Sequence, residues 1–159
     1  MKTYVITLSR YFLAAHSKAG EPTNFRDAFN AGQVFNRGSE CTYLRPKLHT
    51  IRANYPLWEN RIKEVQDGKA MLSIRQWTGK PYRSKQIEIA RLTAENGVGI
   101  ERLEFANGKL GMPRIGIVYQ RKHELARNDG LTLDDWQEWF RGYDLSKPMA
   151  IIHFTKFRY

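Results

Sequence analysis

The sequence predicts an α+β domain whose strands form a mixed, partly closed β-barrel with flanking helices. Five or six short segments rich in β-branched and aromatic residues alternate with a few helical patterns over 159 residues. These strand segments are too short and too unevenly spaced for a repeating strand–helix–strand array. No repeat or low-complexity tract divides the chain, so residues 1–159 are interpreted as a single domain.

The N-terminal third predicts one strand and one helix. Residues 3–12 are mostly β-branched and aromatic, which favours a strand. Phe25 and Phe29 lie four residues apart and share one helical face, and Gly32 is a plausible end for that helix. Residues 33–46 show no sustained period and end at Pro46, so they are expected to form an irregular, insertion-like loop.

The middle of the chain predicts most of the sheet. Residues 49–52 are a short strand candidate, and residues 54–65 indicate a turn with one or two helical turns. The pair Asp67-Gly68 is a turn signal, and residues 69–77 are expected to form the strand that follows.

Further strands are expected after an insertion-like loop at 77–86. Residues 86–93 and 98–106 alternate apolar and polar side chains, as half-buried strands do. Asn107-Gly108 is a turn signal, and residues 115–119 indicate one more short strand.

The C-terminal part predicts a helix at 133–141 and a final strand at 149–157. Thr132 and Asp135 have the spacing of a capping box, which makes Thr132 the expected N-cap. Because Thr132 can satisfy the first amides, Asp129 is not needed as a cap. Asp129 is then either part of an ordinary Asp-Gly turn or a carboxylate available for chemistry.

The charge is strongly positive and unevenly distributed. The chain carries 26 Lys and Arg against 16 Asp and Glu, a formal net charge of +10. Residues 37–91 hold 12 basic and 5 acidic residues, whereas residues 121–144 hold 4 basic and 6 acidic residues. This asymmetry favours a side that faces a polyanion, although a solvated basic surface is the alternative.

Composition excludes several other classes. Cys41 is the single cysteine, so neither an intramolecular disulfide framework nor a cysteine-cluster metal site is expected. The histidines are scattered without zinc-ligand spacing, and no cofactor is predicted. The apolar runs are far shorter than the ~20 residues needed to span a bilayer. With no apparent signal peptide, a cytoplasmic protein without a membrane partner is expected.

The predicted loop at 77–86 interleaves aromatic and basic side chains. They are Trp77, Lys80, Tyr82, Arg83 and Lys85. Such a pattern suits base stacking combined with phosphate contacts on single-stranded nucleic acid. The alternative is that Trp77 only ends a strand with its ring in the core.

A second candidate for anion binding precedes the first predicted helix. His16, Lys18, Gly20 and Thr23 lie in a loop where Thr23 or Asn24 can cap the helix, and a phosphate can bind at such a helix start. The alternative is a capped helix behind a solvated loop.

An ordered set of motifs resembles the ASCH domain family of the PUA-like superfamily. The set comprises a helix ending in Ala31-Gly32, the string Lys47-Leu48-His49-Thr50-Ile51-Arg52, the turn residue Gly68, the stretch Asp129 to Thr132 before a helix, and a final strand. The resemblance covers most of the chain and implies a small β-barrel associated with RNA. The loops at 33–46 and 77–86 depart from the family pattern.

The same resemblance implies a candidate active site. Small bacterial members include an amidohydrolase of N4-acetylcytidine that uses a lysine, a threonine three residues later and a glutamate before the late helix. Here Lys47, Thr50 and Asp129 match these positions, with aspartate in place of glutamate. Lys47 would act as a base, Asp129 would orient it, and Arg52 or a backbone amide would stabilise an oxyanion. Because residues three apart on a strand face opposite sides, Lys47 must lie before the strand.

Three functional hypotheses follow. The favoured one is an RNA- or modified-nucleoside-binding domain with a basic cleft lined by Lys47, Thr50, Arg52, Arg75 and the 77–85 loop. The second is an amidohydrolase of N4-acylated cytidine-type nucleosides that uses Lys47, Thr50 and Asp129. The third is a structural or partner-binding protein whose basic charge is incidental. Binding is favoured because the resemblance supports it directly.

Overall fold

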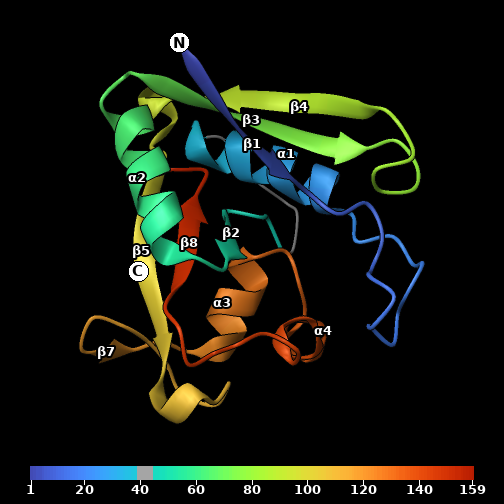
Figure 1. The fold of residues 1–159 in the computed structure, drawn as a ribbon, viewed down its shortest axis with the longest axis vertical. Helices are drawn as coiled ribbons and strands as arrows, with labels where there is room; N and C mark the ends of the chain where they lie inside the picture. Colours follow the sequence, from blue (N-terminus) through green and yellow to red (C-terminus); the bar gives the residue numbers. More distant parts are fainter. Residues whose placement is uncertain (39–44) are drawn as a thin grey trace.

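The structure, a computed structural model, describes residues 1–38 and 45–159, which contain four α-helices and eight strands (Figure 1). The helices are α1 (Phe25–Asn36), α2 (Tyr55–Gln66), α3 (Lys122–Asn128) and α4 (Leu133–Phe140). The strands are β1 (Lys2–Thr7), β2 (His49–Arg52), β3 (Ala70–Trp77), β4 (Gln86–Leu92), β5 (Gly99–Phe105), β6 (Pro113–Ile115), β7 (Val118–Tyr119) and β8 (Met149–His153). Two short 3-10 turns, η1 (Ala94–Asn96) and η2 (Ala106–Gly108), flank β5.

The strands form two sheets. The first has the order β1-β3-β4, with β1 parallel and β4 antiparallel to β3. The second has the order β2-β8-β5-β6-β7 and is antiparallel throughout. Neither sheet closes into a barrel, so the α+β class is confirmed at the level of two open sheets with helices.

Helix α2 joins the two sheets through the core. It packs against β3 of the first sheet and against β5 and β8 of the second (Figure 1). Ile62 and Val65 of α2 are fully buried, as are Leu72 of β3 and Ile151 of β8. The inner strand β8 is buried at every position, because β2 and β5 pair with its two edges and side chains cover both faces.

Helix α1 is longer than its sequence pattern predicts. It continues past Gly32 to Asn36, so the first residues of the loop expected at 33–46 are helical. Gly32 does not end the helix; a Cβ there would lie 2.7 Å from the carbonyl oxygen of Lys47. The glycine therefore permits close approach of another segment. Residues 39–44 of the expected loop, including Cys41, lie outside the described residues.

Two other expectations were wrong in extent, and one helix was not expected. Residues 54–65 form a full helix, α2, because Trp58, Ile62 and Val65 provide a buried helical face. The expected strand at 3–12 ends at Thr7, after which the chain leaves the sheet. Helix α3 was not predicted, because its short sequence is mostly polar.

Near the candidate site, the observed bounds of the strands agree better with those predicted from the sequence. The strand at 49–52 was predicted correctly, and a loop connects β3 to β4 as expected. The segment 115–119 is instead divided into β6 and β7 around Gly116, whose φ is +61°. The final strand is shorter than predicted and ends at His153.

Candidate functional site

Lys47 lies in the segment that enters β2, and two helices hold this segment. Its backbone N–H donates to the carbonyl of Ala28 in α1 at 2.8 Å. The next amide, that of Leu48, donates to the carbonyl of Asn128 in α3 at 2.7 Å. Lys47 therefore precedes β2, which is the condition for its side chain to lie on the same side as that of Thr50.

Asp129 ends helix α3 and faces Lys47. Gly130 follows it in the left-handed conformation, with φ of +81°, so the Asp-Gly turn that was one of the two alternatives for Asp129 is present. Thr132 caps α4 by accepting the Asp135 amide proton at 3.2 Å. The Asp129 carboxylate is consequently free to accept a hydrogen bond from the Lys47 ammonium at 2.6 Å.

This pair is almost completely buried. Lys47 is 2% exposed and Asp129 is 4% exposed, and the ammonium also lies 4.2 Å from the centre of the Phe25 ring. Burial lowers the pKa of Lys47 and raises the pKa of Asp129, while their mutual attraction opposes both changes. Burial therefore disfavours the charged form of each group, and the contact between the two groups stabilises both charged forms.

Thr50 and Arg52 line the same pocket, whose volume is about 130 Å³. Thr50 is buried, and its hydroxyl forms no hydrogen bond within residues 1–38 and 45–159. The Arg52 guanidinium donates to the Thr7 carbonyl at 2.7 Å, and its buried Nε has no partner among the described residues. The pocket thus holds two cations, a carboxylate and a hydroxyl with unused hydrogen-bonding capacity.

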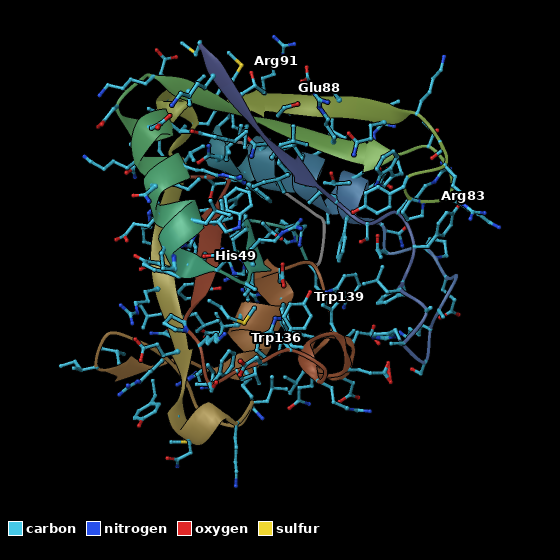
Figure 2. The ribbon with its side chains drawn as sticks, viewed as in Figure 1. His49, Arg83, Glu88, Arg91, Trp136 and Trp139 are labelled. Atoms are coloured by element: carbon cyan, nitrogen blue, oxygen red, sulfur yellow. The ribbon has the colours of Figure 1, made fainter. Side chains whose placement is uncertain are left out.

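Four aromatic side chains also line the pocket. They are Phe25, Trp139, Phe140 and Tyr143. Trp139 extends from α4 towards the middle of the molecule (Figure 2) and lies 5.7 Å from the Phe25 ring, centre to centre. The arrangement of polar groups behind aromatic walls suits a planar polar ring.

A buried network behind Asp129 was missed by the sequence analysis. His49 Nε2 lies 2.6 Å from the Tyr159 hydroxyl, which accepts a hydrogen bond from the Asn128 amide at 3.0 Å. Because the Asn128 side-chain nitrogen donates this hydrogen bond, the Tyr159 hydroxyl can donate its own proton to His49 Nε2. The imidazole proton then lies on Nδ1, which is 3.9 Å from the Asp129 carboxylate. Burial lowers the pKa of His49 well below its usual value, consistent with a neutral ring.

A larger, more apolar groove of about 450 Å³ adjoins the same stretch of chain. The groove and the pocket share Ser9 and Leu13 as lining residues. Trp77 and Tyr82 line the groove with their rings 5.2 Å apart, and Tyr82 is 89% exposed. Trp77 is only partly buried, so its ring contributes to the groove surface rather than to the core.

The predicted loop cations lie on the loop that carries Tyr82, but none of them lines the groove. Lys80, Arg83 and Lys85 are exposed and form no ion pair with another described residue. Figure 2 shows Arg83 at the outer end of the β3–β4 loop. Arg75 is not brought to the pocket; its Nε donates to Ser73 on the same face of β3 at 2.8 Å.

The described residues offer no evident metal centre and no membrane-spanning helix. Within residues 1–38 and 45–159, no three His, Cys, Asp or Glu side chains are grouped so as to hold a metal ion. In the same part of the chain, no helix is both long and apolar enough to cross a bilayer. Comparison with protein-family models, curated proteins and solved structures finds no match.

Proposed function

We propose that the protein binds RNA or a modified nucleoside, with one base in the pocket of Lys47, Thr50, Arg52 and Asp129. The observation that carries this proposal is the buried pair at 2.6 Å beside unpartnered polar groups. A buried charge pair is costly to assemble for stability alone, so the position of this pair in the lining of a pocket favours a role in ligand recognition.

The chemistry of the pocket selects a base-like ligand. Lys47 and the Arg52 guanidinium are donors, Asp129 is an acceptor, and the Thr50 hydroxyl can serve as either. A pocket of about 130 Å³ is small beside the ~300–1,000 Å³ of typical ligand sites, so a single ring would enter it. Sugar, phosphate and neighbouring bases would then occupy the adjoining groove, where Trp77 and Tyr82 provide stacking surfaces.

The resemblance to ASCH domains supports the same proposal. The string from Lys47 to Arg52 lies at the pocket, and so does the Asp129-Gly130 turn that the resemblance singled out. A PUA-like arrangement, in which the two open sheets correspond to a partly closed barrel, is part of this proposal.

Competition binding tests the proposal. A fluorescent single-stranded RNA of about ten nucleotides is bound by the protein and then displaced with free nucleosides, N4-acetylcytidine among them. We expect displacement by at least one nucleoside, and a loss of affinity of about tenfold or more in Thr50→Val, which removes the hydroxyl but keeps the shape. The Thr3→Val variant, at an exposed position of β1 outside the pocket and the groove, is the matched control. The proposal fails if the protein retains no RNA and no nucleoside at low salt.

A second candidate function is hydrolysis of an acylated amine on such a nucleoside. It is favoured by one specific observation, the Lys47–Asp129 contact beside a free Thr50 hydroxyl. Neutral Lys47 would take the proton of a water or of Thr50, and the oxygen would add to the acyl carbon. Arg52 would stabilise the oxyanion. Cleavage of the carbon–nitrogen bond would return the proton to the amine and release the acid; an acyl-Thr50 intermediate would first require attack by water.

Release of acetate from N4-acetylcytidine tests this candidate separately. If the protein is an enzyme, Lys47→Met is expected to abolish release. Thr50→Val would reduce turnover more than binding if the hydroxyl is the nucleophile. Wild-type protein that leaves a panel of acylated nucleosides intact would remove the hydrolytic candidate and leave the binding proposal standing.

A further inference from the structure

A third hollow, of about 320 Å³, lies at the start of α1 and is not part of the pocket around Lys47. It is bounded by the chain after β1, the first turn of α1 and the β3–β4 hairpin. Its polar lining residues are Arg10, Asn24, Arg26, Asp27 and Gln76. Arg10 and Tyr11 also line the apolar groove beside Trp77, so the two hollows border the same residues.

Gln76 is the most informative residue of this hollow. It is 6% exposed, yet its side-chain amide forms no hydrogen bond to any residue in 1–38 or 45–159. On β3 it pairs with Ile87 of β4, and both side chains line the hollow. Neither of its amide atoms is among the fully buried polar atoms that lack a partner, so the amide is accessible from the hollow and can form hydrogen bonds with a ligand there.

The first turn of α1 presents free backbone donors beside this amide. The Phe25 N–H donates to Thr23 Oγ1 at 3.3 Å, and the Ala28 N–H donates to the Asn24 carbonyl at 3.0 Å. Between them, the amides of Arg26 and Asp27 have no backbone or side-chain partner among the described residues. Asn24 adopts the left-handed conformation and forms no capping hydrogen bond. Helix starts with free amides favour anions.

The charges of the hollow favour an anion overall. Arg10 and Arg26 contribute two guanidinium groups, and Asp27 contributes one opposing carboxylate. None of the three forms an ion pair with another described residue, although Arg10 also donates to the Thr78 carbonyl. Guanidinium groups and helix amides together are typical partners of phosphate.

We propose that this hollow is a phosphate-binding subsite in which Gln76, the amides of Arg26 and Asp27, and the Arg10 and Arg26 guanidiniums hold one phosphate group. The assignment of that phosphate to a nucleotide rests on the proposed function. Since Arg10 and Tyr11 border both hollows, a ligand that stacks on Trp77 can place a neighbouring phosphate here. The phosphate belongs either to a free nucleotide or to an RNA backbone.

Inorganic phosphate is the first probe, because its binding does not depend on any base. We expect saturable ¹⁵N shifts of the Gln76 side-chain amide and of the Arg26 and Asp27 backbone amides during NMR titration. Gln76→Leu should weaken phosphate binding at least fivefold, and Asp27→Asn should strengthen it severalfold by removing the opposing charge. Gln86→Leu is the matched control, because Gln86 lies on the same sheet and donates instead to Thr7.

A nucleoside, its 5′-monophosphate and a dinucleotide then distinguish the sources of the phosphate. A free-nucleotide ligand predicts that the monophosphate gains affinity over the nucleoside and that Gln76→Leu removes the gain. An RNA ligand predicts the gain only in the dinucleotide.

Nucleosides that bind without any gain from phosphate would overturn the subsite while leaving the proposed function intact. Inorganic phosphate that binds through Gln76, with no nucleoside binding, would support the subsite and refute the proposed function. Shifts spread over all basic residues and unaffected by Gln76→Leu would also overturn the subsite.

Discussion

Lys47 and Asp129 show how burial changes the role of two ordinary charged side chains. On a surface, such a pair contributes little to stability. Here both groups are removed from water, and each is compensated mainly by the other at 2.6 Å. Removing one member of the pair should therefore lower the free energy of unfolding far more than replacing both members by apolar side chains.

A double-mutant cycle measures this difference. We expect Asp129→Leu or Lys47→Met alone to lower the free energy of unfolding by about 3–5 kcal/mol, because each leaves an unpaired buried charge. The double variant Lys47→Met/Asp129→Leu should recover most of that loss. Urea unfolding followed by circular dichroism gives the four values. Additive single effects would show that the two groups do not act as a pair.

The buried histidines predict a dependence of stability on pH. Burial lowers the pKa values of His49 and His153 in the folded protein, so the unfolded chain binds protons first as pH falls. Stability is therefore complete above the unfolded value of about 6.5 and decreases below it, by up to about 1.4 kcal/mol per pH unit for each histidine.

Urea unfolding between pH 5 and 8 checks this slope. His49→Gln should reduce it, whereas His123→Gln should not, because His123 is exposed. Equal slopes in wild type and His49→Gln would contradict the neutral, buried assignment of His49.

At the scale of elements, the site depends on close contact between α1 and the segment before β2. A Cβ at Gly32 would meet the Lys47 carbonyl oxygen at 2.7 Å, which no real Cβ tolerates without a shift of the backbone. The sequence analysis identified Gly32 but assigned it to the end of the helix. Periodicity within α1 contains no information about the segment that packs against it.

Gly32→Ala is accordingly expected to be destabilising. In an exposed helix interior, replacing glycine by alanine stabilises by about 1 kcal/mol, but here the clash should reverse the sign and displace Lys47. Asn30→Ala, at an exposed position of the same helix, is the control and should be neutral or stabilising. Thermal unfolding of both variants checks the expectation, and a more stable Gly32→Ala protein would refute the close packing.

At the scale of the whole molecule, local sequence patterns predicted local structure better than they predicted contacts between distant segments. The strand at 49–52, the Asp129-Gly130 turn and the Thr132 cap follow from short-range signals and are confirmed. The pairing of β2 with β8 and the contact of His49 with Tyr159 join residues about 100 positions or more apart in sequence. Helix α3 was missed because its burial comes from tertiary packing and not from its own composition.

The long-range electrostatic field of the positively charged molecule should affect its binding of nucleic acid. Arg83 and Lys85 are exposed on the β3–β4 loop, which also carries Tyr82 of the groove. If they contact phosphates, Arg83→Glu/Lys85→Glu should weaken RNA binding and reduce the dependence of log Kd on log salt by up to about two.

The matched reversal Lys63→Glu/Lys69→Glu changes the net charge by the same amount at α2 and its following turn. Fluorescence anisotropy at several salt concentrations compares the two variants. An identical effect of both pairs would indicate general attraction by the net charge of +10 and no specific role of the loop.

The most direct measurement is a titration of nucleosides, N4-acetylcytidine first, that follows the ¹⁵N indole signal of Trp139 in the pocket wall. We expect a saturable shift in the wild-type protein and its loss in the folded Lys47→Met/Asp129→Leu variant. No shift with any nucleoside, or the same shift in both proteins, would contradict the assignment of this pocket to a base.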